Sequence, residues 1–267
     1  DLEKLDNQIK IQNPGALVII PSDNPTGQFL SQDTIVKIAK ICLKNNTWLV
    51  SDEAYRQLYY NKEDTSSSIW RINDKDIPGI TGSRISIESA SKVWNACGLR
   101  VGALVTDNLE FHNKAVYEYT ANLCANNIGQ YIFGSLAHET HENLNKWYAK
   151  QRKYYRSIMV SLKENLLKEL PGLIVTNPAA AIYLVIDFKN ICDKNFNAED
   201  FVRYCSSEGK VLIDDIYYTL LLAPMDSFYS DSSNGKTQLR IAMVEPKYRI
   251  NYAPKILSSL YNDYLKI

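Results

Sequence analysis

The chain has 267 residues, of which 45% are hydrophobic and 22% are charged, and its 30 basic and 30 acidic side chains cancel. This composition is that of a globular protein and excludes a disordered chain, a collagen-like repeat and a coiled coil. The absence of net charge argues against nucleic-acid and membrane partners. No apolar run approaches the ~20 residues that cross a bilayer. The five cysteines show no CxxC spacing, which favours a reduced, cytoplasmic protein.

The first third of the chain predicts a βαβ unit. Residues 16–20 form a short apolar run typical of a buried parallel strand, and Ser31 suits the N-cap of a helix that ends near 45–46. Residues 48–50 predict the next buried strand, which leads into Asp52. Strand, helix and strand in this order indicate a sheet with parallel strands.

The remaining elements suggest two domains. Residues 84–88 and 99–105 predict two further strands, and 108–170 lack proline and predict several helices. The last hundred residues predict an α+β pattern, with strands at 173–176, 182–187, 211–213 and 238–244 and helices at 198–207 and from 247 onward. We therefore expect an α/β first domain over 1–155 and a smaller α+β domain over 156–267.

Four local features have both an ordinary and a functional interpretation. Asn24-Pro-Thr-Gly27 reads as a plain turn, and Asp52 could cap a helix, although the end of a parallel strand is where open α/β sheets bind ligands. Lys92 stands among small residues, so it is either a surface lysine or an amine suited to a Schiff base. Arg240 lies within an apolar strand, where its charge needs a partner such as a carboxylate.

Together, in this order and spacing, these features resemble the class I/II aminotransferases, which bind pyridoxal 5'-phosphate on fold type I. The resemblance rests on Asn24-Pro-Thr-Gly27, Asp52-x-x-Tyr55, Ser89-x-Ser-Lys92, Arg100 and Arg240, and it covers nearly the whole chain. It implies the C-terminal part of a large cofactor-binding domain followed by a small domain. It also implies transfer of an amino group from an amino acid to a 2-oxo acid, with 2-oxoglutarate as the acceptor, by a homodimer.

The resemblance assigns roles in cofactor chemistry to four residues. Lys92 would carry the cofactor as a Schiff base and, once released, would act as the general base of the proton transfer. Asp52 would keep the pyridine nitrogen protonated, which makes the ring a better electron sink. Tyr55 and Asn24 would hydrogen-bond the phenolic oxygen of the cofactor.

The resemblance assigns the binding of the cofactor phosphate and the substrate carboxylate to the remaining residues. Ser89 and Arg100 would hold the cofactor phosphate, Arg100 through its charged fork. Arg240 would bind the α-carboxylate of the substrate with assistance from Asn24. The Asn-Pro bond of the turn is often cis in this family.

The position of the motifs implies that an N-terminal part is absent. In the family the Asn-Pro-Thr-Gly turn falls roughly midway along the chain, whereas here it begins at Asn24, and the chain starts at Asp1 rather than at methionine. We therefore also keep two alternatives open. One is a non-catalytic truncated fragment, and the other is a lyase or decarboxylase of the same fold that uses the same lysine.

Three further patterns have weaker functional interpretations. Ser89-x-x-Lys92 also matches the acyl-enzyme motif of penicillin-recognising proteins, but the partner motifs lack a glycine and nearly touch. His138 and His141 are one residue short of the HExxH zinc spacing, so a solvated polar face is the favoured interpretation and no metal is expected. Cys97 is expected to be a small packing residue.

Overall fold

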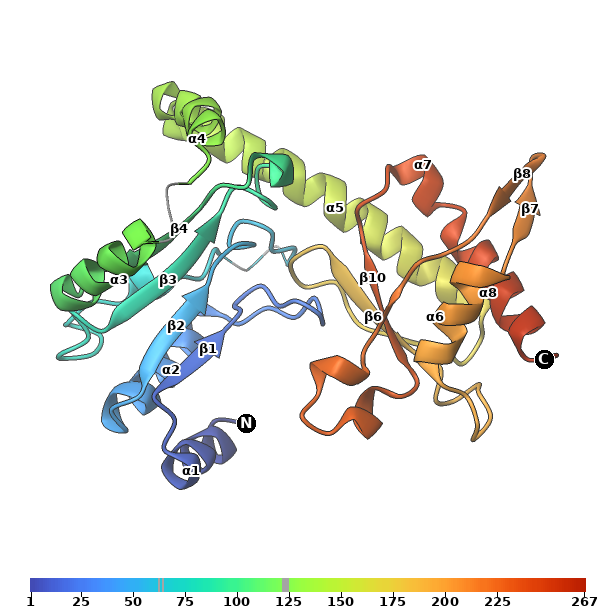
Figure 1. Ribbon diagram of the computed structural model, residues 1–267, viewed down its shortest axis with the longest axis horizontal. Coiled ribbons are helices and arrows are strands. Elements are labelled where there is room, and N and C mark those ends of the chain that lie inside the picture. Colours follow the sequence, from blue (N-terminus) through green and yellow to red (C-terminus); the bar gives the residue numbers. More distant parts are fainter. Residues whose placement is uncertain (62, 64, 122–124) are drawn as a thin grey trace. The chain divides into compact units, whose positions relative to one another are not determined.

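The computed structural model describes residues 1–61, 63, 65–121 and 125–267 (Figure 1). The chain divides into two compact units. The first unit comprises Asp1–Asp23 and Phe29–Arg152, and the second comprises Asn24–Gln28 and Lys153–Ile267. Within the described residues no helix is both long and apolar enough to cross a membrane.

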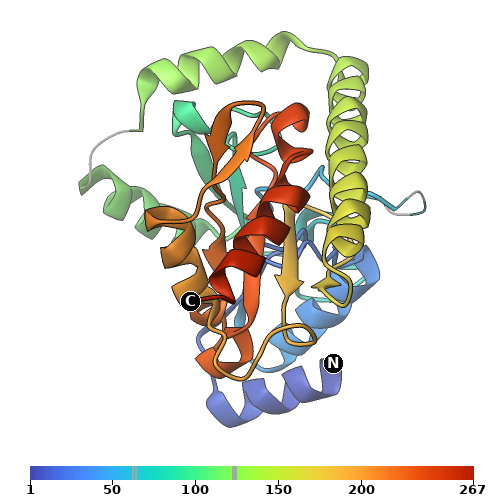
Figure 2. The same cartoon turned by 90° about the vertical axis from the view of Figure 1, so that its right-hand side faces the viewer.

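The first unit contains one sheet with helices around it. Its strands are β1 (Ala16–Ile19), β2 (Trp48–Asp52), β3 (Arg84–Ser89) and β4 (Gly102–Thr106). Its helices are α1 (Leu2–Gln12), α2 (Gln32–Lys44), α3 (Leu109–Ala121), α4 (Asn127–Gly134) and the first part of α5 (His141–Glu169), with 3₁₀ turns η1 (Ile69–Arg71), η2 (Cys97–Leu99) and η3 (Ser135–His138). Helix α5 is continuous over 29 residues and runs on into the second unit (Figure 2).

The sheet of the first unit has the order β1-β2-β3-β4. Strands β1, β2 and β3 are parallel, and β4 is antiparallel to β3. The carboxyl ends of β2 and β3 therefore meet at one edge of the sheet, because Asp52 is aligned with Ile87. This arrangement of a parallel sheet with helices confirms the predicted α/β fold class.

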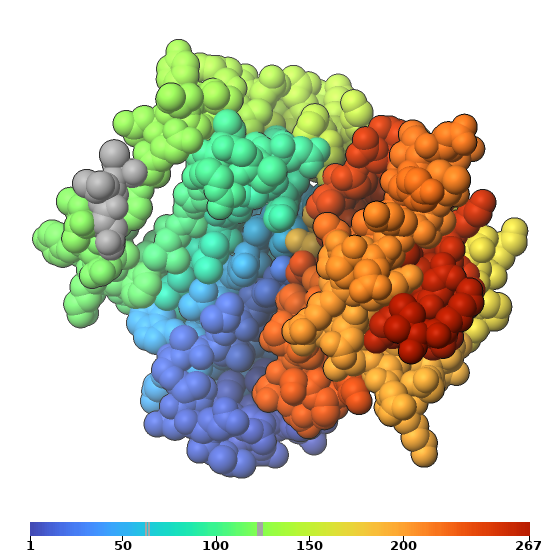
Figure 3. All heavy atoms as spheres, turned by 45° about the vertical axis from the view of Figure 1, so that its right-hand side comes forward, coloured from blue at the N-terminus to red at the C-terminus, as the bar shows by residue number. Residues whose placement is uncertain are grey.

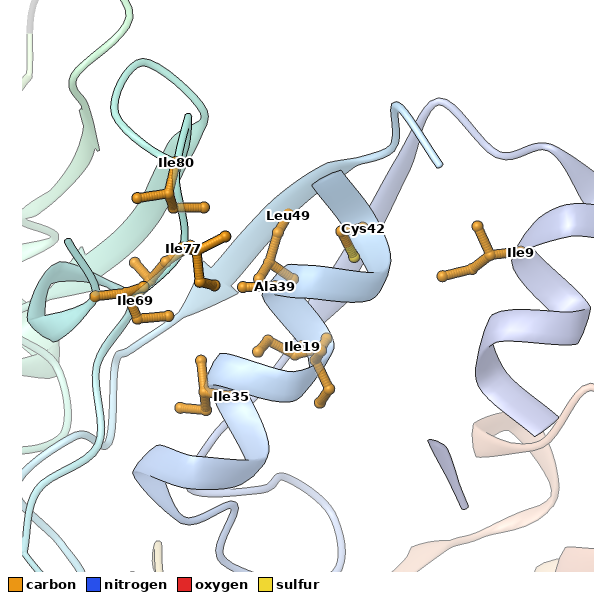
Figure 4. Close-up of a cluster of buried hydrophobic side chains, with 11 residues drawn as sticks. Ile9, Ile19, Ile35, Ala39, Cys42, Leu49, Ile69, Ile77 and Ile80 are labelled. Atoms are coloured by element: carbon orange, nitrogen blue, oxygen red, sulfur yellow. The ribbon is translucent and has the colours of Figure 1, made fainter. Parts of the chain in front are cut away.

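Helix α2 forms because its apolar residues recur at helical spacing. Ser31 caps it, as predicted, and its Oγ accepts a hydrogen bond from the Thr34 amide at 3.3 Å. The buried face of the helix contains Ile35, Ala39 and Cys42, which join strand residues such as Leu49 in a hydrophobic cluster (Figure 4). Full burial of each large aliphatic side chain contributes about 1.5–3 kcal/mol. This packing fixes β1 and β2, and with them the end of β2 at Asp52.

One strand boundary expected in the first unit differs from the structure, and one helix was not expected. The strand expected over 99–105 begins at Gly102, because η2 precedes it and Arg100 adopts the left-handed conformation, with φ of 52°. Helix α1 was not predicted, since Ile9 is its only buried residue and its other side chains give a weak apolar pattern. The helices expected between 108 and 170 are present as α3, α4 and α5.

The second unit is an antiparallel sheet with helices. Its sheet has the order β5-β6-β10-β9, and a separate hairpin pairs β7 with β8. The strands are β5 (Ile174–Val175), β6 (Tyr183–Asp187), β7 (Val211–Ile213), β8 (Ile216–Tyr218), β9 (Ala223–Pro224) and β10 (Gln238–Ala242). The helices are α6 (Ala198–Ser207), α7 (Lys247–Ile250) and α8 (Ala253–Tyr264), with 3₁₀ turns η4 (Asp226–Phe228) and η5 (Ser232–Gly235).

Aromatic packing holds the helices of the second unit together. The ring of Phe201 on α6 lies 5.3 Å from that of Tyr264 on α8, and Phe188 lies 4.9 Å from Tyr261. Figure 3 shows the segments of α6 and α8 side by side, in orange and red. Such ring pairs stabilise a core by about 0.5–1.5 kcal/mol each beyond the burial of their area.

Candidate functional site

Asp52 is the last residue of β2 and lies at the carboxyl edge of the first unit's sheet. Its Oδ1 accepts a hydrogen bond from the Ala54 amide at 3.1 Å, which turns the chain out of the strand. Tyr55 follows three residues later and is buried. The carboxylate of Asp52 has no ion-pair partner among the described residues.

The neighbouring Glu53 fixes the backbone that carries Asp52. Its fully buried carboxylate accepts hydrogen bonds from the Ser68 hydroxyl at 2.7 Å and from the Ile69 amide at 2.8 Å. Arg56 pairs with Glu53 at 2.8 Å and with Glu88 at 3.0 Å. Burial raises the pKa of the Glu88 carboxyl, and Arg56 opposes this rise. The network ties the loop after β2 to β3.

Lys92 lies in the loop that follows β3. Ser89, the last residue of that strand, starts the loop by accepting the Ser91 amide hydrogen on its Oγ at 3.0 Å. The Lys92 Nζ stands 5.9 Å from the centre of the Tyr55 ring. In the part of the chain that the structure describes, this amine forms neither a hydrogen bond nor an ion pair, so it is available to an external group.

An aromatic cluster anchors the Lys92 loop on α5. The indole N–H of Trp147 donates a hydrogen bond to the Val93 carbonyl at 3.1 Å. The ring of Trp94 stacks on that of Trp147 at 6.4 Å and packs against Tyr148 at 5.2 Å and Phe133 at 5.9 Å. These contacts hold both residues after Lys92, so the lysine projects from a fixed backbone.

Arg100 and Cys97 lie in the turn before β4. Arg100 is exposed, and its Nη1 donates a hydrogen bond to the Cys97 carbonyl at 2.9 Å. The Ala90 amide bonds the Val101 carbonyl at 3.0 Å, which brings Arg100 next to the start of the Lys92 loop. Cys97 is exposed, so its expected role as a packing residue is wrong. It is the first residue of η2.

The Asn24-Pro-Thr-Gly27 turn belongs to the second unit, and its Asn24–Pro25 bond is cis. Gly27 has a φ of +70°, and a Cβ there would lie 2.3 Å from the Tyr183 carbonyl oxygen. Its own carbonyl accepts hydrogen bonds from the Ala179 and Ala180 amides at 3.1 and 2.8 Å. Only glycine permits this close approach, which seats the turn beside β6.

The seated turn brings Asn24 to Arg240 on β10. The Arg240 Nη1 donates a hydrogen bond to the Asn24 Oδ1 at 2.9 Å, although 216 positions separate the two residues. The Arg240 Nε is buried without a hydrogen-bond partner, and no carboxylate pairs with Arg240 among the described residues. The guanidinium therefore has binding capacity left for an anion.

The predicted site residues are divided between the two units. The first unit holds five of them and the second unit holds two, namely Asp52, Tyr55, Ser89, Lys92 and Arg100 in the first and Asn24 and Arg240 in the second. Sequence reasoning missed Tyr183 and Phe228, whose rings cover the Arg240 guanidinium, and Trp94, which anchors the Lys92 loop. No local motif marks these aromatic residues, because strand register and loop packing decide their contacts.

The histidine pattern does not form a shared helix face. His138 ends η3, whereas His141 begins α5, so the two residues lie on different elements. Among the residues that the structure describes, no group of three potential ligands could hold a metal ion.

The chain belongs to the aminotransferase class I and II family, whose sequence profile matches residues 1–252. A "Probable alanine aminotransferase, mitochondrial" of Dictyostelium discoideum is 30% identical over 220 residues, which cover 79% of this chain and 40% of that protein. An aspartate aminotransferase of a Bacillus species is 27% identical, and the match covers 79% of this chain and 52% of that protein. The chain therefore spans about half the length of these curated relatives.

Solved structures show the same fold at lower identity. The α-aminoadipate aminotransferase LysN from Thermus thermophilus, solved in complex with N-(5'-phosphopyridoxyl)-L-leucine, has a TM-score of 0.81 and 21% identity. The match covers all of this chain and 63% of that one. An aspartate aminotransferase double mutant from the same organism has a TM-score of 0.74 and 18% identity, and the match covers 97% and 60% of the two chains.

The described residues fit pyridoxal phosphate chemically. Lys92 offers an amine that forms no hydrogen bond or ion pair among the described residues. Asp52, at the carboxyl edge of the sheet, offers a carboxylate that accepts a hydrogen bond from the Ala54 backbone amide. Ser89 and Arg100 supply a hydroxyl and a guanidinium suited to a phosphate. A cofactor with an aldehyde, a basic ring nitrogen and a phosphate matches this donor set.

Proposed function

We propose that the protein from which this chain comes is a pyridoxal-phosphate-dependent aminotransferase that moves an amino group from an amino acid to a 2-oxo acid. The proposal rests above all on the Lys92 amine, which has no partner among the described residues and lies 5.9 Å from the Tyr55 ring centre, in the loop after β3. Membership of the aminotransferase class I and II family supports it. Pyridoxal phosphate supplies, when bound, an aldehyde that combines with amines and a ring that accepts electrons.

The residues of the first unit would bind the cofactor and move the proton. Lys92 takes a proton from the substrate α-carbon and returns it, since an amine without an ion pair can act as a general base. Asp52 keeps a proton on the ring nitrogen by placing a negative charge beside it. Tyr55 donates a hydrogen bond to the phenolic oxygen, and Ser89 and Arg100 bind the phosphate.

The residues of the second unit would bind the substrate. Arg240 forms in-plane hydrogen bonds to the α-carboxylate, which both the amino acid and the 2-oxo acid carry. Asn24 orients the guanidinium through the bond to Nη1 and leaves its own amide N–H groups for the carboxylate and the phenolic oxygen. Because both substrates carry this carboxylate, the same arginine can bind the amino acid in one half of the reaction and the 2-oxo acid in the other.

The reaction type is tested by exposing cofactor-loaded protein to a panel of amino acids. Transfer predicts one equivalent of 2-oxo acid per cofactor, conversion of the cofactor to its amine form, and recovery of the aldehyde form on addition of 2-oxoglutarate. Pyruvate with free ammonia would indicate a lyase instead, and carbon dioxide a decarboxylase. A protein that binds cofactor but converts no amino acid would contradict the catalytic proposal for this chain.

We also propose a homodimer in the cytoplasm. Helix α3 has no buried residue, and Leu109 and Tyr117 on it are 74% and 77% exposed, which is unusual for large apolar side chains. A second copy of the chain would cover this surface. Light scattering coupled to gel filtration tests the dimer, and a monomer mass across the accessible concentrations would contradict it.

A further inference from the structure

Two aromatic rings lie close to the guanidinium of Arg240. Its Cζ is 4.9 Å from the centre of the Tyr183 ring and 5.2 Å from that of Phe228. Both distances fall within the range in which the ring quadrupole attracts a cation. Two ring contacts together with the hydrogen bond to Asn24 restrict the guanidinium more than the hydrogen bond alone would.

Strand register supplies the first ring. Strands β6 and β10 are antiparallel, with Arg240 opposite Val185 and Ala242 opposite Tyr183. Tyr183 and Arg240 are therefore diagonal neighbours on one face of the sheet, which is within reach of an aromatic side chain. Tyr183 is buried, so its ring is a fixed wall.

The turn after β9 supplies the second ring. Strand β9 lies beside β10, and the Met225 amide bonds the Gln238 carbonyl at 3.1 Å, which directs the chain into η4. The Phe228 amide then bonds the Met225 carbonyl at 3.1 Å. Gly235 packs so closely on this turn that a Cβ there would lie 2.4 Å from the Met225 carbonyl carbon. Phe228 therefore comes from a braced turn, although its side chain is partly exposed.

The ring contacts leave the N–H groups of the guanidinium as its binding positions. The Arg240 Nε has no hydrogen-bond partner among the described residues, and Nη1 donates to Asn24. A planar carboxylate can accept two parallel hydrogen bonds from a guanidinium. Ring contacts that hold the side chain in place lower the conformational freedom that Arg240 loses on binding.

We propose that Tyr183 and Phe228 are positioning residues that hold the Arg240 guanidinium in place for the substrate carboxylate. This inference rests on the proposed function, because that function assigns the carboxylate to Arg240. Phe228 is the more informative of the two rings, since its substitution removes one ring contact while the buried Tyr183 remains.

The test uses three variants of the full chain. Phe228→Leu removes the ring and keeps apolar volume, and Phe228→Tyr restores a ring. Tyr248→Leu is the matched control, because the Tyr248 ring lies 5.9 Å from the Cζ of another arginine, Arg249, on α7. Circular dichroism establishes that each variant folds, and Arg240→Lys assigns the Arg240 signal in the spectra.

The first readout is the ¹H–¹⁵N resonance of the Arg240 Nε–H, which needs no catalysis. The ring currents of Tyr183 and Phe228 should shift this proton upfield, so we expect the shift to shrink in Phe228→Leu, to return in Phe228→Tyr and to stay unchanged in Tyr248→Leu. The second readout is the affinity for pyruvate, titrated on the same resonance. We expect it to fall about three- to tenfold in Phe228→Leu alone, as suits the loss of one ring. In the cofactor-loaded protein, KM for the amino acid should rise by a similar factor, with kcat little changed.

The outcomes separate this inference from the function on which it rests. If wild type binds pyruvate and Phe228→Leu binds it equally well, the positioning role of the rings is wrong, while the role of Arg240 in binding the carboxylate stands. An Arg240 Nε–H resonance without an upfield shift in wild type would also refute the positioning role of Tyr183 and Phe228. If wild type does not bind pyruvate at Arg240, the proposed function fails, and the inference fails with it.

Discussion

Gly27→Ala should destabilise the second unit more than an ordinary glycine substitution. Gly27 has φ of +70°, and its Cα faces the Tyr183 carbonyl so closely that an added Cβ would lie 2.3 Å from the oxygen. Ordinary van der Waals contact is 3.4–4 Å, so the turn or β6 must move. Because the neighbouring atom is backbone, no side-chain rotation can relieve the overlap.

The expected loss of stability in Gly27→Ala has two contributions. A left-handed conformation costs a residue with a Cβ about 1–2 kcal/mol. Displacing the turn also weakens the hydrogen bonds from the Ala179 and Ala180 amides to the Gly27 carbonyl, each worth about 1 kcal/mol. We therefore expect Gly27→Ala to lower the free energy of unfolding of the second unit by about 3–4 kcal/mol.

Gly79→Ala is the matched control. Gly79 has a similar φ of +83°, but nothing lies within 4 Å of its Cβ position, so only the conformational cost of about 1–2 kcal/mol remains. Urea unfolding followed by circular dichroism measures both variants. All four tryptophans, Trp48, Trp70, Trp94 and Trp147, lie in the first unit, so their fluorescence reports that unit alone. Equal losses of stability in the two variants would refute the close approach of Gly27 to Tyr183.

Two further predictions concern thiol reactivity and acid stability. Burial raises the pKa of Cys42 to about 11 and that of Cys205 to about 12. In the native protein a thiol reagent should therefore modify the exposed Cys97 and spare these two cysteines until urea is added. Rapid labelling of Cys42 or Cys205, detected by mass spectrometry, would contradict this prediction. The hydrogen bond from Lys10 lowers the pKa of Asp6 to about 2, so its stabilising effect should be complete above about pH 4 and lost as pH falls toward 2. The difference in stability between wild type and Asp6→Asn should shrink over that interval, and a difference independent of pH would contradict the assignment.

Apolar periodicity and capping residues predicted the helices and strands whose position depends on neighbouring residues in the sequence. Helix α2 and strands β1 and β2 have clear apolar periodicity and a side-chain cap at Ser31, so their positions were confirmed within two residues. The start of β4 was wrong because the left-handed Arg100 and the turn before it are set by pairing with the Lys92 loop, which apolar periodicity does not reveal.

The candidate site could be predicted only where motifs mark it. Lys92 and Arg240 stand in short, recognisable contexts, and the structure places Lys92 in the loop after β3 and Arg240 within β10. No such motif marks the two aromatic residues that contact Arg240. Tyr183 reaches it through the register of two distant strands, and Phe228 reaches it through a turn braced by Gly235. These are long-range contacts, which a pattern along the chain does not contain.

The central claim is that Lys92 is the residue that holds the cofactor, and borohydride trapping tests it most directly. Protein incubated with pyridoxal phosphate, reduced with borohydride and digested should carry the cofactor mass on the peptide that contains Lys92. Lys92→Ala should carry none there, and Lys146→Ala, at an exposed lysine paired with Glu142, should be labelled like wild type. Unmodified Lys92 peptide with label on other lysines would contradict the account.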